Sequence, residues 1–156
     1  MDRRSIIALA LYSLNGLGSG VLQSVLTKEF DAEMLIEEGS EKISKGVRGE
    51  AFRKLQKEWR KDREGTFRRM EKYAEGMEAE GIHFTYCYDE GYPKRLLSLG
   101  DHPFGLFYIG SLPSEELPVV SVIGARECSE YGWRCAEDFG SYVIDEKEGP
   151  LFYVFI

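Results

Sequence analysis

A glycine turn near residue 124 has the composition of an anion-binding site. The β-branched run Val119–Ile123 predicts a buried strand that stops at Gly124, and Tyr131–Val143 predicts the helix that follows. Glycine at such a turn allows a ligand to approach the backbone, and a guanidinium suits phosphate oxygens. Because Ser129 is also placed to cap the following helix, the sequence predicts a phosphate site. Its residues would be Gly124, Ala125, Arg126 and Ser129.

The same turn lacks the full signature of a nucleotide-binding loop. It has neither the G-x-G-x-x-G of dinucleotide binders nor the G-K-[ST] ending of a P-loop. The sequence therefore predicts no NAD or ATP cofactor. A strand, glycine and arginine in this order also occur in turns that are only structural, and this alternative stays open.

A second glycine-rich turn lies between two apolar helical segments. Helical spacing of apolar residues predicts a helix over Ser5–Ser13 and another from Val21 onward. Gly16 and Gly18 lie between them, where exposed amide groups at a helix start can hold a phosphate. The pattern is typical of a helix-hairpin-helix element that binds the DNA backbone, although an ordinary turn between helices is an equal alternative.

Basic residues are concentrated in one segment of an acidic chain. The net charge is −7, yet Lys42–Lys72 holds 12 basic and 5 acidic residues, while the remainder holds 8 and 22. Such a segment can neutralise phosphates, and Lys57, Arg60 and Lys61 are its secondary DNA-backbone candidates. The alternative is a solvated helix face balanced by acids at i,i+4 spacing, namely Glu50, Glu58, Asp62, Glu64 and Glu71.

Residues for metal binding or catalysis are sparse. Cys87, Cys128 and Cys135 have no CxxC spacing, and the two histidines, His83 and His102, are not at ligand distance in sequence. We therefore expect free, buried or half-buried thiols, with no metal site. No nucleophile and base occur in a recognisable arrangement, and Asp89 and Glu90 are interpreted as turn residues, so we expect no catalytic residues.

The elements that position these residues divide the 156-residue chain near residue 80. Apolar spacing over 49–80 predicts one or two helices with a possible break at Gly65, and alternation after Gly81 predicts a strand. Further along, the patterns predict a short helix, a second strand and a β-rich end, at Lys94–Leu99, Leu106–Ile109 and Leu151–Ile156. No signal peptide or membrane-spanning run is evident, so we expect a cytoplasmic protein.

Four ordered motifs resemble the DprA/Smf family of DNA-processing proteins. They are Tyr92–Leu97, Asp101–Gly110, Val122–Arg126 and Ser129-x-Tyr131-Gly132. The resemblance is good from Tyr86 to about Tyr142, and the helical region before it matches in kind. Ala125 replaces the commoner serine, so a hydroxyl contact at that position is missing.

The resemblance implies an α/β fold in two domains. Residues 1–80 would form a small helical domain, helix-hairpin-helix or SAM-like, and residues 81–156 the start of a Rossmann-like domain. The family's continuation, a glycine-rich S-G-x-A-x-G-x-D segment, does not follow Asp145, which implies a truncated domain. In the family the glycine-arginine turn contacts DNA phosphate, and Tyr131 and Gly132 complete the motif here.

The resemblance also implies a function without catalysis. Family members bind single-stranded DNA, self-associate and help load a RecA-type recombinase on incoming DNA during natural transformation. We therefore expect single-stranded DNA as partner, with a recombinase and a homodimer implied by the family and no membrane. The alternatives are a nucleotide or phosphoribosyl hydrolase of a related fold, and an inactive remnant that acts as an interaction fragment.

Overall fold

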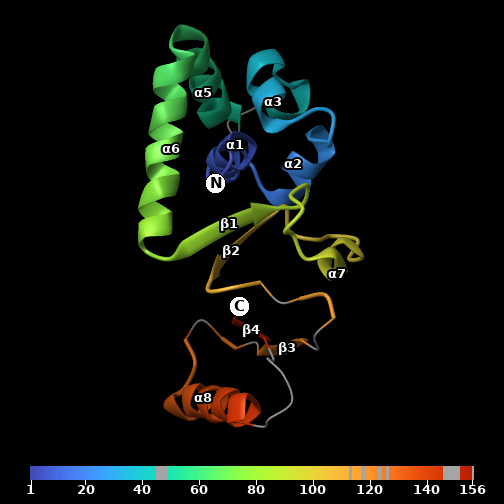
Figure 1. Cartoon of the computed structure of the whole chain (residues 1–156). Coiled ribbons are helices and arrows are strands. Elements are labelled where there is room, and N and C mark those ends of the chain that lie inside the picture. The colour runs from blue at the N-terminus through green and yellow to red at the C-terminus, as the bar shows by residue number, and fades with distance from the viewer. Residues whose placement is uncertain are drawn as a thin grey trace. The chain divides into compact units, whose positions relative to one another are not determined.

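The chain forms two compact units, Met1–Ser111 and Leu112–Ile156 (Figure 1). The computed structural model describes residues 1–44, 49–112, 114–116, 119–122, 124–125, 127–145 and 152–155. It contains both helices and sheets, in agreement with the expected α/β class in its general form. The first unit extends past residue 80 to Ser111, so the first strand pair belongs to the helical unit by its packing. The domain limits drawn from the sequence stay a prediction.

Four short helices open the first unit. They are α1 (Arg3–Tyr12), α2 (Ser19–Val25), α3 (Ala32–Glu38) and α4 (Glu41–Ser44). Aspartates cap α1 and α3: the Asp2 carboxylate accepts from the Ser5 amide at 2.8 Å, and Asp31 accepts from the amides of Glu33 and Met34. That hydrogen bond from Ser5 holds the pKa of Asp2 below its usual range. The predicted helices at the start of the chain are confirmed, while α4 was not predicted.

Two longer helices, α5 (Glu50–Lys61) and α6 (Arg63–Ala79), form a hairpin. The break lies at Asp62, so the break considered at Gly65 is wrong. The Asp62 side chain folds over the first turn of α6 and accepts from the Gly65 amide at 2.9 Å. A Cβ on residue 65 would lie 2.0 Å from the Asp62 Oδ2 atom. Glycine at position 65 therefore leaves room for the capping carboxylate, and it does not mark the end of a helix.

The strands β1 (Ile82–Tyr86) and β2 (Gly105–Ile109) pair antiparallel, with Phe84 opposite Phe107. The short helix α7 (Lys94–Leu97) lies in the connection between them. The Tyr12 ring, at the end of α1, lies within 6.0 Å of the rings of Phe84, Phe104 and Phe107. This aromatic cluster attaches the strand pair to the helices.

One apolar core holds the first unit together. Its largest fully buried side chains come from α1, α2, α3, α5 and the segment before β2, namely Ile7, Leu9, Leu11, Leu22, Leu26, Leu35, Ile36, Phe52 and Phe104. Helix α1 packs against α3, α6 and β1, and α5 packs against α3 and α6. The buried stripe of α5 therefore faces this core, which leaves its opposite face to solvent.

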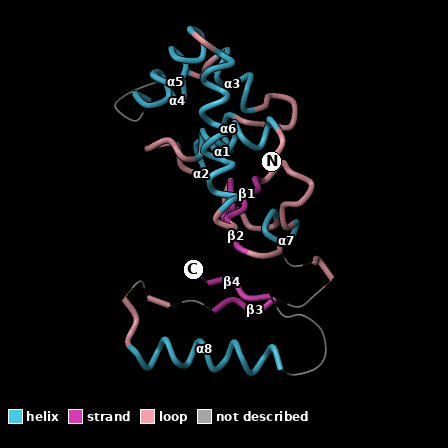
Figure 2. The backbone as a smooth tube through the Cα atoms, turned by 60° about the vertical axis from the view of Figure 1, so that its left-hand side comes forward, coloured by secondary structure: helices cyan, strands magenta, loops and turns pink. Residues whose placement is uncertain are grey.

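The second unit contains a strand, a helix and a parallel strand. They are β3 (Val119–Val122), α8 (Glu130–Asp145) and β4 (Phe152–Phe155), and β3 and β4 lie side by side (Figure 2). Val119 is opposite Phe152 in this register, and Val122 is opposite Phe155. Parallel strands joined through a helix are the repeating unit of open α/β sheets. The β-rich end predicted from the sequence thus contains the strand β4, which pairs with β3.

Candidate nucleic-acid interface

The turn between β3 and α8 is open to solvent. Gly124 and Ala125 are exposed, and Ser129 caps α8: its hydroxyl accepts from the Gly132 amide at 3.2 Å and its carbonyl from the Trp133 amide at 3.0 Å. The predicted capping role of Ser129 is confirmed. Arg126, the predicted phosphate ligand, lies outside the described residues. The turn therefore joins the carboxyl end of a strand to the amino end of a 16-residue helix.

Nothing inside the described chain requires glycine at position 124. Its φ angle is not positive, and an added Cβ would meet no atom within 4 Å. The same test at Gly65 shows a severe clash, so the two glycines have different roles. An absent side chain at an open turn is most useful to a ligand that must reach the backbone.

Two aromatic side chains stand exposed in the first turn of α8. Tyr131 is 78% exposed and Trp133 is 59% exposed. A hydrogen bond with Cys135 raises the pKa of the Tyr131 hydroxyl. Trp133 lies within the predicted helix and was not predicted as a site residue. At 3.6 residues per turn Trp133 lies about 200° around the helix from Tyr131, and both rings are exposed, so the spacing alone gave no signal of this exposure.

The turn between α1 and α2 contains Gly16 and Gly18, and the backbone conformation explains glycine at one of these two positions. Gly16 has a φ of 92°, which an L-residue rarely adopts, and Gly18 lies at the N-cap of α2 with a φ of −75°. Both are exposed, and no atom lies within 4 Å of a Cβ built on Gly18. The ordinary-turn alternative thus accounts for Gly16, and phosphate binding at the hairpin stays a prediction.

Helix α5 separates its apolar and basic residues cleanly. Phe52 and Trp59 are buried, while five cations are exposed on the opposite side, namely Arg53, Lys54, Lys57, Arg60 and Lys61. At 3.6 residues per turn they occupy an arc of about 120°. We call this set the α5 basic face. It includes all three basic candidates predicted from the sequence, Lys57, Arg60 and Lys61.

Three of the five acids that were expected to balance this segment are engaged elsewhere. Glu58 pairs with Arg69 at 3.0 Å, Asp62 caps α6, and Glu64 lies 3.8 Å from Arg3. Lys54, Lys57 and Lys61 make no ion pair among the described residues, and Arg60 donates only to the neutral Glu37 carbonyl at 3.3 Å. The balanced-face alternative therefore does not describe these lysines.

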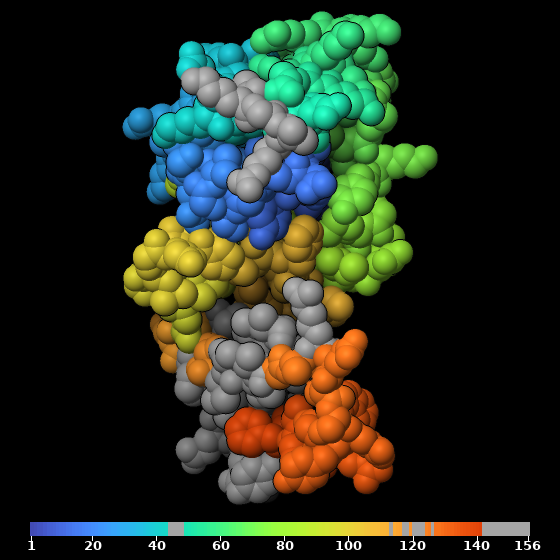
Figure 3. Space-filling view, turned by 180° about the vertical axis from the view of Figure 1, so that it is seen from behind, coloured from blue at the N-terminus to red at the C-terminus, as the bar shows by residue number. Residues whose placement is uncertain are grey.

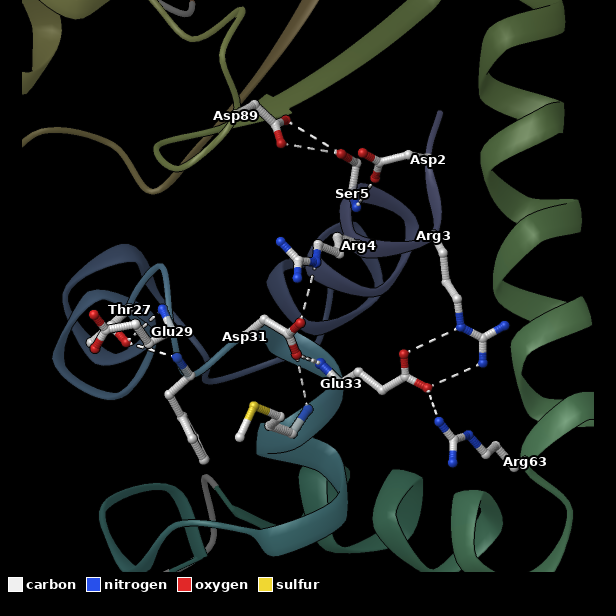
Figure 4. Close-up of polar contacts among 12 residues, drawn as sticks. Asp2, Arg3, Arg4, Ser5, Thr27, Glu29, Asp31, Glu33, Arg63 and Asp89 are labelled. Atoms are coloured by element: carbon white, nitrogen blue, oxygen red, sulfur yellow. Dashed lines mark hydrogen bonds and ion pairs between the residues drawn. The ribbon is translucent and has the colours of Figure 1, made fainter.

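A separate ionic network ties α1, α3 and α6 together (Figure 4). Glu33 accepts from Arg3 at 3.1 and 3.2 Å and also from Arg63, and Arg63 pairs with Glu37 at 2.9 Å. The Arg3 guanidinium lies 4.0 Å from the centre of the Phe67 ring. The hydrogen bond from Arg3 is the main cause that lowers the pKa of Glu33. The arginines of this network serve the fold, in contrast to the lysines of α5.

Replacing Glu33 by glutamine should destabilise the first unit at neutral pH by about 1–2 kcal/mol, because two guanidinium groups lose their shared carboxylate. The pKa of Glu33 is lowered by folding, so its contribution is present above its ordinary pKa, near 4.5, and is lost as the pH falls through the lowered value. Urea unfolding of Glu33→Gln and the parent protein between about pH 3 and 7 measures this.

The matched control is Glu37→Gln, which removes a more exposed carboxylate from Arg63. Its side chain is 42% exposed against 19% for Glu33, so we expect a loss below about 0.5 kcal/mol. Equal losses at the two positions, or a Glu33→Gln effect that grows on acidification, would show that the network does not stabilise the fold as described.

Asp89 is a structural residue at the end of β1. Its carboxylate accepts from the Ser5 hydroxyl at 3.2 Å, the Thr85 hydroxyl at 3.1 Å and the Tyr86 amide at 3.1 Å. Burial raises the pKa of Asp89 despite these hydrogen bonds. Its amide and carbonyl also form the turns between Tyr86 and Tyr92. These contacts support the interpretation of Asp89 as a turn residue.

A hollow of about 320 Å³ beside Tyr86 is lined by polar groups of the kind that can bind a ligand. It is lined by side chains that include Arg4, Lys28, Asp31 and Tyr88. Arg4 is paired with Asp31 at 3.3 Å, and the Tyr88 hydroxyl donates to the Leu26 carbonyl at 2.7 Å. Its best-placed polar groups therefore already have partners within the chain.

The three cysteines are free, but only one is buried. Burial raises the pKa of the Cys87 thiol to about 11, whereas Cys128 and Cys135 are exposed, contrary to the expectation of buried or half-buried thiols. In the part of the chain that the structure describes, no group of three or more His, Cys, Asp or Glu side chains could hold a metal ion. No helix among the described residues has both the length and the apolar character needed to cross a membrane.

A family model of known proteins matches the segment that contains the strand, turn and helix described above. The family model of DNA recombination-mediator protein A matches residues 83–148, from β1 through α8. No curated protein and no solved structure matches the chain. The matched segment contains all four motifs on which the resemblance rests. Over residues 83–148 the chain is therefore similar to the DNA recombination-mediator protein A (DprA/Smf) family, in agreement with the resemblance of its motifs.

Proposed function

We propose that the protein binds single-stranded DNA in DNA processing and natural transformation. The observation that carries the proposal is the open turn at Gly124 and Ala125, at the amino end of α8, within a segment that matches a family of DNA recombination mediators. Arg126 is the proposed phosphate ligand there. By family resemblance, the further partners are a RecA-type recombinase and a second copy of the chain.

Exposed aromatic residues beside the turn support a single strand rather than a duplex. Unpaired bases stack on aromatic rings, with about 1–3 kcal/mol for each base. Tyr131 and Trp133 present two such rings in the first turn of α8. A backbone contact at the turn together with stacking on α8 would give binding with little sequence preference.

The test is anisotropy of a labelled single-stranded oligonucleotide with the full chain over roughly 50 to 200 mM salt. Affinity should fall steeply as salt rises, because each neutralised phosphate releases counterions. Arg126→Ala should weaken low-salt binding by about tenfold, since it removes charge-assisted hydrogen bonds to phosphate. Arg134→Ala is the matched control: Arg134 pairs with Glu130 at 2.6 Å on the same helix, and we expect less than about a twofold change.

A second variant separates binding from folding. Gly124→Ala should leave the unfolding midpoint unchanged, because its Cβ meets no atom within 4 Å, yet it should weaken DNA binding if a phosphate approaches that backbone. Failure of the parent protein to bind at low salt would refute the proposed function. Equal affinity for the Arg126→Ala, Gly124→Ala and parent proteins would refute the role of the turn.

A further inference from the structure

We propose that the α5 basic face is a second DNA-binding surface, one that contacts the phosphate backbone alone. This inference rests on the proposed function, but it places a binding surface in the other compact unit, outside the family-matched segment. The face consists of Arg53, Lys54, Lys57, Arg60 and Lys61, and helix α5 reaches the molecular surface in the teal-green region of Figure 3.

The first argument is that the arginines of the ionic contacts described above pair with acids, whereas, within the described residues, the lysines of α5 do not. Arginines that stabilise the first unit are paired with acids: Arg3 and Arg63 with Glu33, and Arg69 with Glu58. The three lysines of the α5 basic face make no such pair among the described residues, although the chain carries a net charge of −7. Positive charge left unbalanced in an acidic protein favours an anionic partner.

The second argument is geometric. Lys54, Lys57 and Lys61 recur at i, i+3 and i+7 and so follow one side of the helix over about 10 Å. Neighbouring phosphates of one DNA strand are separated by about 3.4 Å along a duplex axis, so the three lysines can cover about three phosphates. The buried side of α5, held by Phe52 and Trp59, fixes the direction of this row.

Two further features favour DNA over an anionic membrane. A helix that binds a lipid surface needs an exposed apolar side, whereas the apolar side of α5 is buried in the core and none of its large apolar residues is exposed. The family-matched segment of the same chain is similar to DNA recombination mediators. The absence of an exposed ring on α5 also means that this face offers no base stacking and should not distinguish single strands from duplexes.

The test compares charge reversal at two exposed lysines of the same unit in the full chain. Lys57→Glu lies in the centre of the α5 basic face, and Lys28→Glu makes the same charge change beyond the end of α2. We expect Lys57→Glu to weaken low-salt binding by about tenfold, for an oligothymidylate and a duplex alike, and to reduce the salt slope by at least about 0.7, the contribution of one single-strand phosphate contact. Lys28→Glu should change affinity by less than about twofold. Lys57→Arg should retain parent affinity, and unfolding midpoints should be unchanged.

The outcomes separate this inference from the function on which it rests. If the parent protein binds and Lys57→Glu binds equally well, the α5 basic face is not a DNA surface, while the proposed function stands. If the parent protein does not bind DNA, both proposals fail. If Lys57→Glu abolishes binding to vesicles of phosphatidylserine and phosphatidylcholine but leaves DNA affinity unchanged, the face is a membrane surface and the inference is overturned.

Discussion

Phe104→Ala should destabilise the first unit by about 3–5 kcal/mol, the loss typical of removing a fully buried phenyl group. Phe104 is 0% exposed, and its ring lies 5.8 Å from Tyr12 and 5.6 Å from Tyr86, so it joins α1 to the strand pair. Urea unfolding followed by circular dichroism measures the change. The main far-ultraviolet change, from α1 to α6, and the near-ultraviolet change of the aromatic cluster should occur at the same urea concentration, because these helices and the cluster belong to one compact unit.

Phe107→Ala is the matched control for this prediction. Phe107 belongs to the same cluster, with its ring 6.0 Å from Tyr12, but it is 49% exposed. Since about half of its surface remains in water, we expect a loss near 1 kcal/mol. Comparable losses in the two variants would mean that Phe104 is not buried as described. Separate helix and aromatic transitions in the parent protein would mean that the strand pair is not part of the helical unit.

Gly105→Ala should destabilise the same unit by about 1–3 kcal/mol through overpacking. A Cβ on residue 105 would lie 2.5 and 2.8 Å from ring atoms of Phe84 and 3.2 Å from a ring atom of Tyr12. The Phe84 ring is 5% exposed and packs against Phe107, so it has little room to move. The unfolding midpoint in urea should fall without a change in slope.

Gly100→Ala tests whether any glycine substitution in this region would have the same effect. No atom lies within 4 Å of a Cβ on Gly100, and its φ angle is not positive, so we expect a change within about 0.5 kcal/mol. If Gly105→Ala is as stable as the parent protein, the close approach of β2 to the Tyr12 and Phe84 rings is wrong.

Local sequence patterns predicted the helices and strands better than they predicted which of these elements pair or pack together. Helical spacing predicted α1 and α8, and alternation predicted β1, because each pattern arises within one element. The antiparallel pairing of β1 with β2, and its packing on Tyr12, were not predicted. They depend on contacts between residues far apart in sequence, such as the 2.9 Å hydrogen bond from the Cys87 amide to the Phe104 carbonyl.

The roles of the glycines were predicted less accurately than the helices and strands. Gly65 was interpreted as a break because glycine disfavours helix interiors, but Asp62 supplies the break and Gly65 accommodates its carboxylate. At the candidate site, the sequence identified Gly124, Ala125 and Ser129 correctly as a turn and cap, while the role of Arg126 stays a prediction. Trp133 was missed because helical spacing identifies an apolar stripe without showing which side is covered.

The three thiols differ in exposure, and this difference allows the second unit to be labelled chemically without the first. With a pKa of about 11 and a buried side chain, Cys87 carries almost no thiolate at neutral pH and should be inert to maleimide reagents. Cys128 and Cys135 are exposed on either side of the start of α8. A fluorophore added to the unaltered protein would therefore attach beside the Gly124 turn, where an arriving oligonucleotide would change its emission.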